Sequence, residues 1–231
     1  KELADYVSAY DQKMQMKREV IADKGIWTAK KRYILNAWDV EGVRYKDPSL
    51  KIMGIEAVKS STPAPCREKI KEALKIIMSG DEKELNTFIQ DFRSEFVNLP
   101  VEEIAYPRSV NGLGKFRDSA SIYRKGTPMH IKGSLIYNHL ISERNLNAKY
   151  PYIQEGDKIK FIQLRQPNPF GANVISFMTK VPKELDIHRY IDYDTQYEKA
   201  FVEPLSFITD NIGWSIDRSY GTQTTLEEFF A

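Results

Sequence analysis

The spacing of hydrophobic residues changes along the chain and predicts strands first and helices afterwards. Residues 14–45 are rich in β-branched and aromatic side chains, with breaks at Asp23-Lys24-Gly25 and at Glu41-Gly42. We expect this part to form a small antiparallel meander, and residues 51–58 are a candidate for one more extended segment.

Helical spacing begins after residue 60. Ser60-Ser61-Thr62-Pro63 is typical of a helix start, because proline in the first turn loses no hydrogen bond and a hydroxyl group can cap free N–H groups. A first apolar stripe consists of Ile70, Leu74, Ile77 and Met78, before Gly80. A second stripe consists of Leu85, Phe88, Ile89, Phe92 and Phe96, before Leu99-Pro100. Both stripes predict helices that face a core.

The second half of the chain mixes both patterns. Glycines and prolines between 107 and 128 predict a loop, and a third helix is expected from about 130 to 146. Residues 157–165 and 173–178 are expected to pair across a turn at 167–171, with helices from about 182 to 212. The predicted fold class is therefore α+β, a small antiparallel sheet followed by a mainly helical part with a short β insertion.

Composition narrows the class of protein. The chain has 231 residues, of which 42% are hydrophobic and 29% charged, which excludes collagen-like, low-complexity and wholly disordered classes. A single cysteine, Cys66, excludes an internal disulfide, and no apolar run is long enough for a membrane span. Because the chain begins with Lys-Glu-Leu, we expect it to be cut from a longer protein.

The net charge of +2 is unevenly distributed. Residues 13–33 carry seven basic and two acidic residues, and residues 115–165 carry ten basic and four acidic ones. Residues 181–231 carry four basic and ten acidic residues. Two positive surfaces and an acidic end favour contact with a polyanion at one place and with another partner elsewhere, and clustered solvated faces are the alternative.

Candidate catalytic groups are sparse. Gly112-Leu113-Gly114 lacks the third glycine of a phosphate-binding loop, and Cys66 has no histidine nearby in the sequence. The pair Asp192 and Asp194 lies in a helical stretch and is interpreted as a solvated face rather than a two-metal site. No catalytic residue and no metal ligand is therefore expected in this chain.

The cluster Lys30-Lys31-Arg32-Tyr33 is a candidate for nucleic-acid binding. In a strand, Lys31 and Tyr33 would share one face while Lys30 and Arg32 share the other. A cation beside an aromatic ring suits a nucleic-acid backbone, because the charge neutralises phosphate and the ring packs on sugar or base. A solvated surface is the alternative.

The C-terminus carries a second candidate motif. Gln223, Leu226, Phe229 and Phe230 fit the pattern Gln-x-x-Leu-x-x-aromatic-aromatic. In one helical turn the three apolar residues would form a plug, and Gln223 would form hydrogen bonds outside it. This motif resembles the peptide by which replication proteins dock on a sliding clamp, and a terminal helix folded back on its own domain is the alternative.

Several segments together resemble the C-terminal part of family B DNA polymerases of T-even-like bacteriophages. These segments are Lys17–Tyr33, Lys51–Glu56, Ser60–Pro63, His130–Gly133 and Asn168–Gly171. The resemblance covers nearly the whole chain in the same order and is weakest over 107–128.

The resemblance implies where the domains of this chain lie and that the catalytic aspartates belong to another part of the polymerase. It implies the last strands of the palm at 1–60, the thumb at 61–221 and a clamp-binding tail at 222–231. The two metal-binding aspartates of that family's palm have no matching motif here, so the chain alone is expected to be inactive and to hold no cofactor. Mg²⁺ is expected in the complete polymerase.

The resemblance also implies roles for individual residues. Lys31 and Tyr33 match an element that contacts the minor groove near the primer end, and Lys30 and Arg32 flank it. The thumb entry that holds the primer backbone is matched by Lys59, Ser60, Ser61 and Thr62, and Lys132 lies in a further matching thumb segment.

Two functions remain open at this stage. The first is the C-terminal portion of a replicative DNA polymerase in the cytoplasm of an infected bacterial host. Its partners would be primer–template DNA, the sliding clamp and the remaining palm, fingers and exonuclease, without a membrane. The second is a non-catalytic stand-alone module that binds DNA or a clamp.

Overall fold

A computed structural model describes residues 2–10, 13–14, 16–116 and 126–219. The chain divides into two compact units after Val58, two residues before the expected boundary at 60. The structure is α+β, as predicted, and each unit contains an antiparallel three-stranded sheet.

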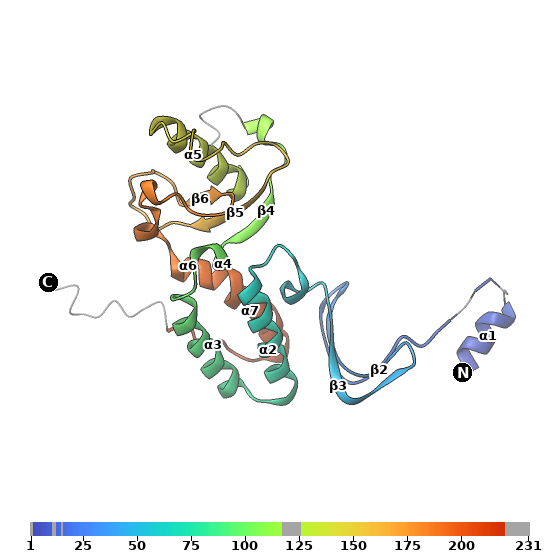
Figure 1. The fold of residues 1–231 in the computed structure, drawn as a ribbon. Helices are drawn as coiled ribbons and strands as arrows, with labels where there is room; N and C mark the ends of the chain where they lie inside the picture. Colours follow the sequence, from blue (N-terminus) through green and yellow to red (C-terminus); the bar gives the residue numbers. More distant parts are fainter. Residues whose placement is uncertain (1, 11–12, 15, 117–125, 220–231) are drawn as a thin grey trace. The chain divides into compact units, whose positions relative to one another are not determined.

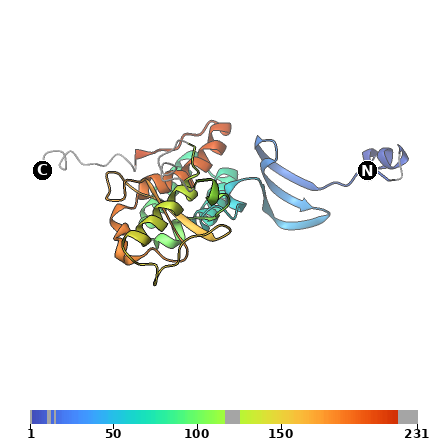
Figure 2. The ribbon, with the colours of Figure 1, turned by 90° about the horizontal axis from the view of Figure 1, so that it is seen from above.

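The first unit is built on a sheet in the order β1-β2-β3 (Figures 1 and 2). A helix, α1 (Glu2–Tyr10), precedes β1 (Val20–Ala29), β2 (Arg32–Val40) and β3 (Val43–Met53), and a 3₁₀ turn, η1 (Glu56–Val58), follows them. Both strand pairs are antiparallel, which confirms the predicted meander.

One of its two predicted breaks is wrong. Strand β1 continues through Asp23-Lys24-Gly25, and irregular register between Ala22 and Lys24 accommodates these residues without ending the strand. The first turn lies instead at Lys30-Lys31. The second break is confirmed, because Glu41 and Gly42 both have positive φ, 53° and 89°, as a two-residue hairpin turn requires.

The second unit begins with the two predicted helices, α2 (Ala64–Ser79) and α3 (Glu82–Phe96), and a short α4 (Val101–Ile104) follows. Asp81 caps α3, because its carboxylate accepts a hydrogen bond from the backbone N–H of Glu84 at 2.8 Å. The expected hydroxyl cap of α2 is wrong. Pro63 occupies the N-cap position of α2, and no side chain caps this helix within the part of the chain that the structure describes.

A second sheet has the order β4-β5-β6. It consists of β4 (Tyr106–Ser109), β5 (Lys158–Gln163) and β6 (Val174–Phe177), and the pairing of β5 with β6 confirms the predicted insertion. Strand β4 lies at the start of the predicted loop. That prediction was wrong here because β4 has four residues, one of them proline, and becomes a strand only through pairing with β5. The loop then continues through a 3₁₀ turn, η2 (Leu113–Phe116).

Helix α5 (Met129–Glu143) packs against β6 at a glycine (Figure 1). A Cβ atom added at Gly133 would lie 2.6 Å from the Ser176 hydroxyl oxygen, 2.7 Å from the Ser176 backbone nitrogen and 2.9 Å from the Ile175 carbonyl carbon. Only a residue without a side chain permits this approach of the helix to the strand backbone.

The predicted helical region at 182–212 is divided into short pieces. They are η4 (Lys183–Leu185), η5 (Ile187–Tyr190), α6 (Tyr193–Tyr197), the π-helical η6 (Glu198–Val202), α7 (Glu203–Thr209) and η7 (Asp210–Ile212). Asp192 caps α6 through the backbone N–H and the hydroxyl of Thr195, and Asp194 forms an ion pair with Arg93. Both aspartates therefore have structural partners.

An aromatic cluster forms the core between α3 and these helices. Phe92, Phe96, Tyr197 and Phe201 are buried, with neighbouring ring centroids 4.7 to 5.8 Å apart. Cys66 is buried as well, and burial raises the pKa of its thiol to about 12, which fits the packing role expected for it. Within the described residues, no helix is both long enough and apolar enough to cross a membrane.

We expect Gly133→Ala to lower the free energy of unfolding by up to about 2 kcal/mol, measured by urea denaturation. Alanine improves helix propensity by about 1 kcal/mol, but overpacking against backbone that cannot move aside costs about 1 to 3 kcal/mol. Gly114→Ala is the control, because among the described residues no heavy atom lies within 4 Å of a Cβ added there. Equal effects of the two substitutions would show that the contact of α5 with β6 is not tight.

Candidate nucleic-acid interface

The basic cluster of the first unit is a hairpin turn. Lys30 and Lys31 connect β1 to β2, both are exposed, and Lys31 is in the left-handed region with φ 62°. The predicted alternation of faces is therefore wrong for these two lysines, because a turn does not alternate as a strand does. Neither ammonium group has a hydrogen-bond or ion-pair partner in the described part of the chain. We call these two residues the lysine turn.

A glycine on the neighbouring segment supports the lysine turn. Gly54 follows β3 with φ 68°, and a Cβ atom added to it would lie 2.3 Å from the carbonyl oxygen of Lys31. Arg32, the next residue, forms an ion pair with Glu56 at 2.8 Å. Arg32 is therefore engaged in holding the turn to the segment after β3, whereas the lysines face solvent.

Tyr33 lies in an exposed apolar row that the sequence analysis did not identify. Its cross-strand partners are Trp27 on β1 and Met53 on β3, which are 65% and 43% exposed. Directly paired residues project from the same face of a sheet, so the three side chains form one row. The indole of Trp27 extends over Gly25, where a Cβ atom would lie 2.6 Å from it. A two-residue turn alone would place Thr28 opposite Tyr33, and an irregular register between Trp27 and Ala29 places Trp27 there instead, which no local sequence signal indicated.

The second basic site surrounds the segment before α2. Thr62 donates its backbone N–H to the carbonyl of Lys59 at 3.1 Å, which closes a turn. Thr62 is only 5% exposed, whereas Ser60 is exposed and Lys59 and Ser61 are half-buried. The predicted contact residues of this segment are therefore not equally accessible.

Arg108 on β4 fixes this turn. Its guanidinium donates to the carbonyl of Ser61 at 2.9 Å and to its neighbour Pro107 at 3.0 Å. A surface hollow of about 380 Å³ lies beside it. The hollow is lined by Ser60, Ser61, Pro107, Arg108, Ser109, Lys158 and Ile159. We call this group the Ser60 hollow.

The Ser60 hollow combines hydroxyl groups with two cationic side chains. Arg108 and Lys158 come from the adjacent strands β4 and β5, where Arg108 pairs with Ile159, the neighbour of Lys158. Hydroxyl groups and a guanidinium in one concavity suit a phosphate group. The sequence analysis missed both cations because β4 was predicted as loop, and no local signal placed residue 108 beside residue 61.

Two further groups near this sheet have other partners. Lys132 donates to the side-chain carbonyl of Asn173 at 3.0 Å and is not among the residues that line the Ser60 hollow. The ring centroid of His130 lies 6.4 Å from that of Phe161, and the pKa of His130 is lowered by burial and by the charge of Arg108. The imidazole is therefore favoured in its neutral form.

The glycine-rich segment at 112–114 binds an anion from its own chain. The backbone N–H groups of Gly112 and Leu113 donate to the two carboxylate oxygens of Glu155 at 2.6 and 2.7 Å. These backbone hydrogen bonds lower the pKa of Glu155. The segment is thus a loop held by a carboxylate, as its poor match to a phosphate loop indicated.

The clamp-binding candidates Gln223, Leu226, Phe229 and Phe230 lie outside the described residues. No group of three or more potential metal ligands occurs among the residues that the structure describes.

Comparisons with known proteins show relatives among phage DNA polymerases. The DNA-directed DNA polymerase of Enterobacteria phage T4 is 34% identical over an alignment of 225 residues that covers 92% of this chain. That of Escherichia phage RB69 is 37% identical over an alignment of 222 residues that covers 90% of this chain. The chain is homologous to these phage DNA polymerases. It spans about a quarter, 24%, of the length of each, and no family model matches it.

We expect Arg108→Ala to lower the free energy of unfolding by about 1 to 3 kcal/mol, because the substitution leaves half-buried carbonyl groups without their charged donor. Chemical denaturation followed by circular dichroism measures this change. Arg189→Ala is the matched control, since Arg189 is 76% exposed and its ion pair with Asp186 is worth about 0.5 kcal/mol or less. A loss at residue 108 no larger than at residue 189 would contradict the anchoring role of Arg108.

Proposed function

We propose that this chain is the C-terminal portion of a replicative DNA-directed DNA polymerase, comprising the end of the palm (1–60), the thumb (61–221) and a clamp-binding tail (222–231). The homology to two phage DNA polymerases over nine-tenths of the chain carries this proposal. In this role the chain works in the cytoplasm of an infected bacterial host, together with the remaining palm, fingers and exonuclease.

The first task of the chain in this proposal is to hold primer–template duplex. The lysine turn places two ammonium groups without protein partners in the described chain against backbone phosphates, while the row of Trp27, Tyr33 and Met53 packs on sugar edges. In the Ser60 hollow, Arg108 and Lys158 bind a phosphate of the primer strand together with Ser60 and Ser61. Such contacts position a duplex without reading its sequence.

The chemistry of nucleotide transfer is not assigned to this chain. Two-metal phosphoryl transfer requires carboxylates that hold Mg²⁺, and the described residues offer no group of three potential ligands. The aspartates that the phage polymerase resemblance implies lie in the rest of the polymerase. This chain supplies orientation of the primer end and retention of the duplex, which keep the reacting groups in place.

We expect Lys31→Ala to weaken binding of all duplex sequences alike and to reduce the slope of log K against log salt by about one unit, because one phosphate contact is lost. Fluorescence anisotropy with duplexes of unrelated sequence, at several salt concentrations, measures both effects. Lys75→Ala is the matched control, since Lys75 is an exposed lysine on α2 and its removal changes the net charge equally. A change in base preference, or an equal effect of Lys75→Ala, would contradict the assignment.

The second task is to dock on the sliding clamp through Gln223, Leu226, Phe229 and Phe230. Aromatic residues that fill a pocket are typical binding hot spots, so Phe229→Ala or Phe230→Ala should cost about 2 kcal/mol or more of binding free energy to the cognate clamp. Calorimetry measures this loss. Phe207→Ala is the control, since Phe207 is an exposed phenylalanine on α7.

Truncation after Gly221 separates the tail from the fold. It should abolish clamp binding and leave duplex binding and the melting temperature nearly unchanged. A sharply lowered melting temperature with clamp binding retained would identify the tail as a structural helix instead.

A further inference from the structure

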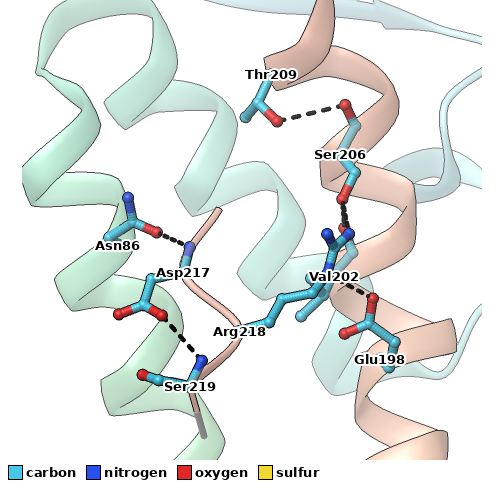
Figure 3. A network of polar contacts seen from close by, with 8 residues as sticks. All are labelled: Asn86, Glu198, Val202, Ser206, Thr209, Asp217, Arg218 and Ser219. Carbon is cyan, nitrogen blue, oxygen red and sulfur yellow. Dashed lines mark hydrogen bonds and ion pairs between the residues drawn. The ribbon is translucent and has the colours of Figure 1, made fainter. Parts of the chain in front are cut away.

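The chain between η7 and residue 220 is bound along α3 in an extended conformation. Gly213, with φ 73°, ends η7, and residues 214–219 then run beside α3 (Figure 3). Trp214 and Ile216 are half-buried, whereas Ser215 and Asp217, which alternate with them, are exposed. We call residues 214–219 the strap.

One carboxamide on α3 binds the strap as a neighbouring strand would. The side-chain nitrogen of Asn86 donates to the carbonyl of Ser215 at 2.9 Å. Its side-chain oxygen accepts from the N–H of Asp217 at 2.8 Å (Figure 3). An asparagine side chain has one acceptor and one donor group, and both are used here on backbone groups two residues apart.

Two more side chains on the same face of α3 extend this contact. One turn before Asn86, the carboxylate of Glu82 accepts from the N–H of Ser215 at 2.9 Å. One turn after it, Gln90 donates to the carboxylate of Asp217 at 3.2 Å. Residues four apart on a helix lie above one another, so α3 presents a continuous row of polar partners to the strap.

The strap is also bound on its other side. Arg218 donates to the carboxylate of Glu198 on η6 at 2.9 Å and to the hydroxyl of Ser206 on α7 at 2.6 Å (Figure 3). The strap therefore lies between two groups of helices that meet in the aromatic core. Backbone and side-chain contacts both hold it, and its four polar residues are exposed.

We infer that the strap fixes the position of Ser219, to which residues 220–231 are attached, and so limits the reach of the tail, with Asn86 as the positioning residue. This inference rests on the proposed docking of that tail on a clamp. With the strap bound, Gln223 lies at most about 14 Å from Ser219 along the chain. If the strap detaches as far back as Trp214, Gln223 can lie up to about 30 Å from Trp214.

The length of chain between the last fixed residue and Gln223 determines how strongly clamp binding and duplex binding reinforce each other. When one chain binds both, the second event is intramolecular, and its effective concentration falls with about the −3/2 power of tether length. Lengthening the tether from four to nine residues should weaken this reinforcement roughly threefold.

Asn86→Leu tests the inference, because leucine keeps the volume of the side chain and removes both hydrogen bonds to the strap, together with one to the carbonyl of Glu82 within α3. Asn98→Leu is the matched control, since the carboxamide of Asn98, in the turn after α3, donates to the carbonyl of Ser94 as that of Asn86 donates to the carbonyl of Glu82. Spin labels on Asp91→Cys and Ser219→Cys report the distance across the strap. Cys66 does not compete for label, because its thiol is buried and has a pKa of about 12.

The full chain should show a narrow distance distribution that Asn86→Leu broadens and Asn98→Leu does not. Affinity for the free clamp should stay within twofold, while affinity for a clamp loaded on primer–template should fall roughly threefold in Asn86→Leu alone. Arg218→Ala releases the strap from the other side without altering α3, and should give the same results if Asn86→Leu fails to fold.

An unchanged distance distribution in both variants would overturn the inference, as would a broadened one with unchanged affinity for the loaded clamp. Absence of clamp binding in every variant, including the parent, would instead contradict the proposed docking function.

Discussion

The buried carboxamide of Gln196 joins the two halves of the second unit. Gln196 is fully buried, and it donates to the carbonyl of Ile104 at the end of α4 while it accepts from the N–H of Gln163 on β5. Its neighbour Tyr197 lies in the aromatic core and donates to the carbonyl of Ile89 on α3. Loss of a buried polar partner leaves unpaired groups on two elements at once, which is costly. Adjacent residues of α6 thus set the register of the sheet against the helices.

This register determines the chemistry of the Ser60 hollow. Its serines precede α2, whereas its cations belong to β4 and β5, so the hollow exists only where the helices and the sheet are held together. The hydrogen bond from Arg108 to the Ser61 carbonyl joins β4 directly to the segment before α2. The lysine turn of the first unit depends on a different contact. Gly54 packs so closely against the carbonyl oxygen of Lys31 that a side chain at residue 54 would not fit. In both sites, contacts between segments distant in the sequence hold the backbone that carries the cationic side chains.

Much of this arrangement could be predicted from the sequence, because it depends on local periodicity. The stripe from Leu85 to Phe96 is a helix whose apolar face is largely buried, and the Glu41-Gly42 turn has the expected conformation. The break at Asp23–Gly25 was predicted wrongly, because pairing with β2 overrides the local turn preference of these residues. Arg108 and Lys158 could not be assigned to the site, since only the pairing of β4 with β5 brings them beside Ser60. The lysine turn was identified by composition, but its geometry required the register of the hairpin.

Hydrogen exchange in the presence of primer–template duplex tests most directly whether the lysine turn and the Ser60 hollow bind the same DNA. Mass spectrometry with and without duplex, at low and high salt, resolves exchange by peptide. The account predicts protection of 28–34, 58–64 and 107–109 together, lost at high salt, with unchanged exchange along α3. Protection of only one of the two sites, or protection centred on α3, would contradict it.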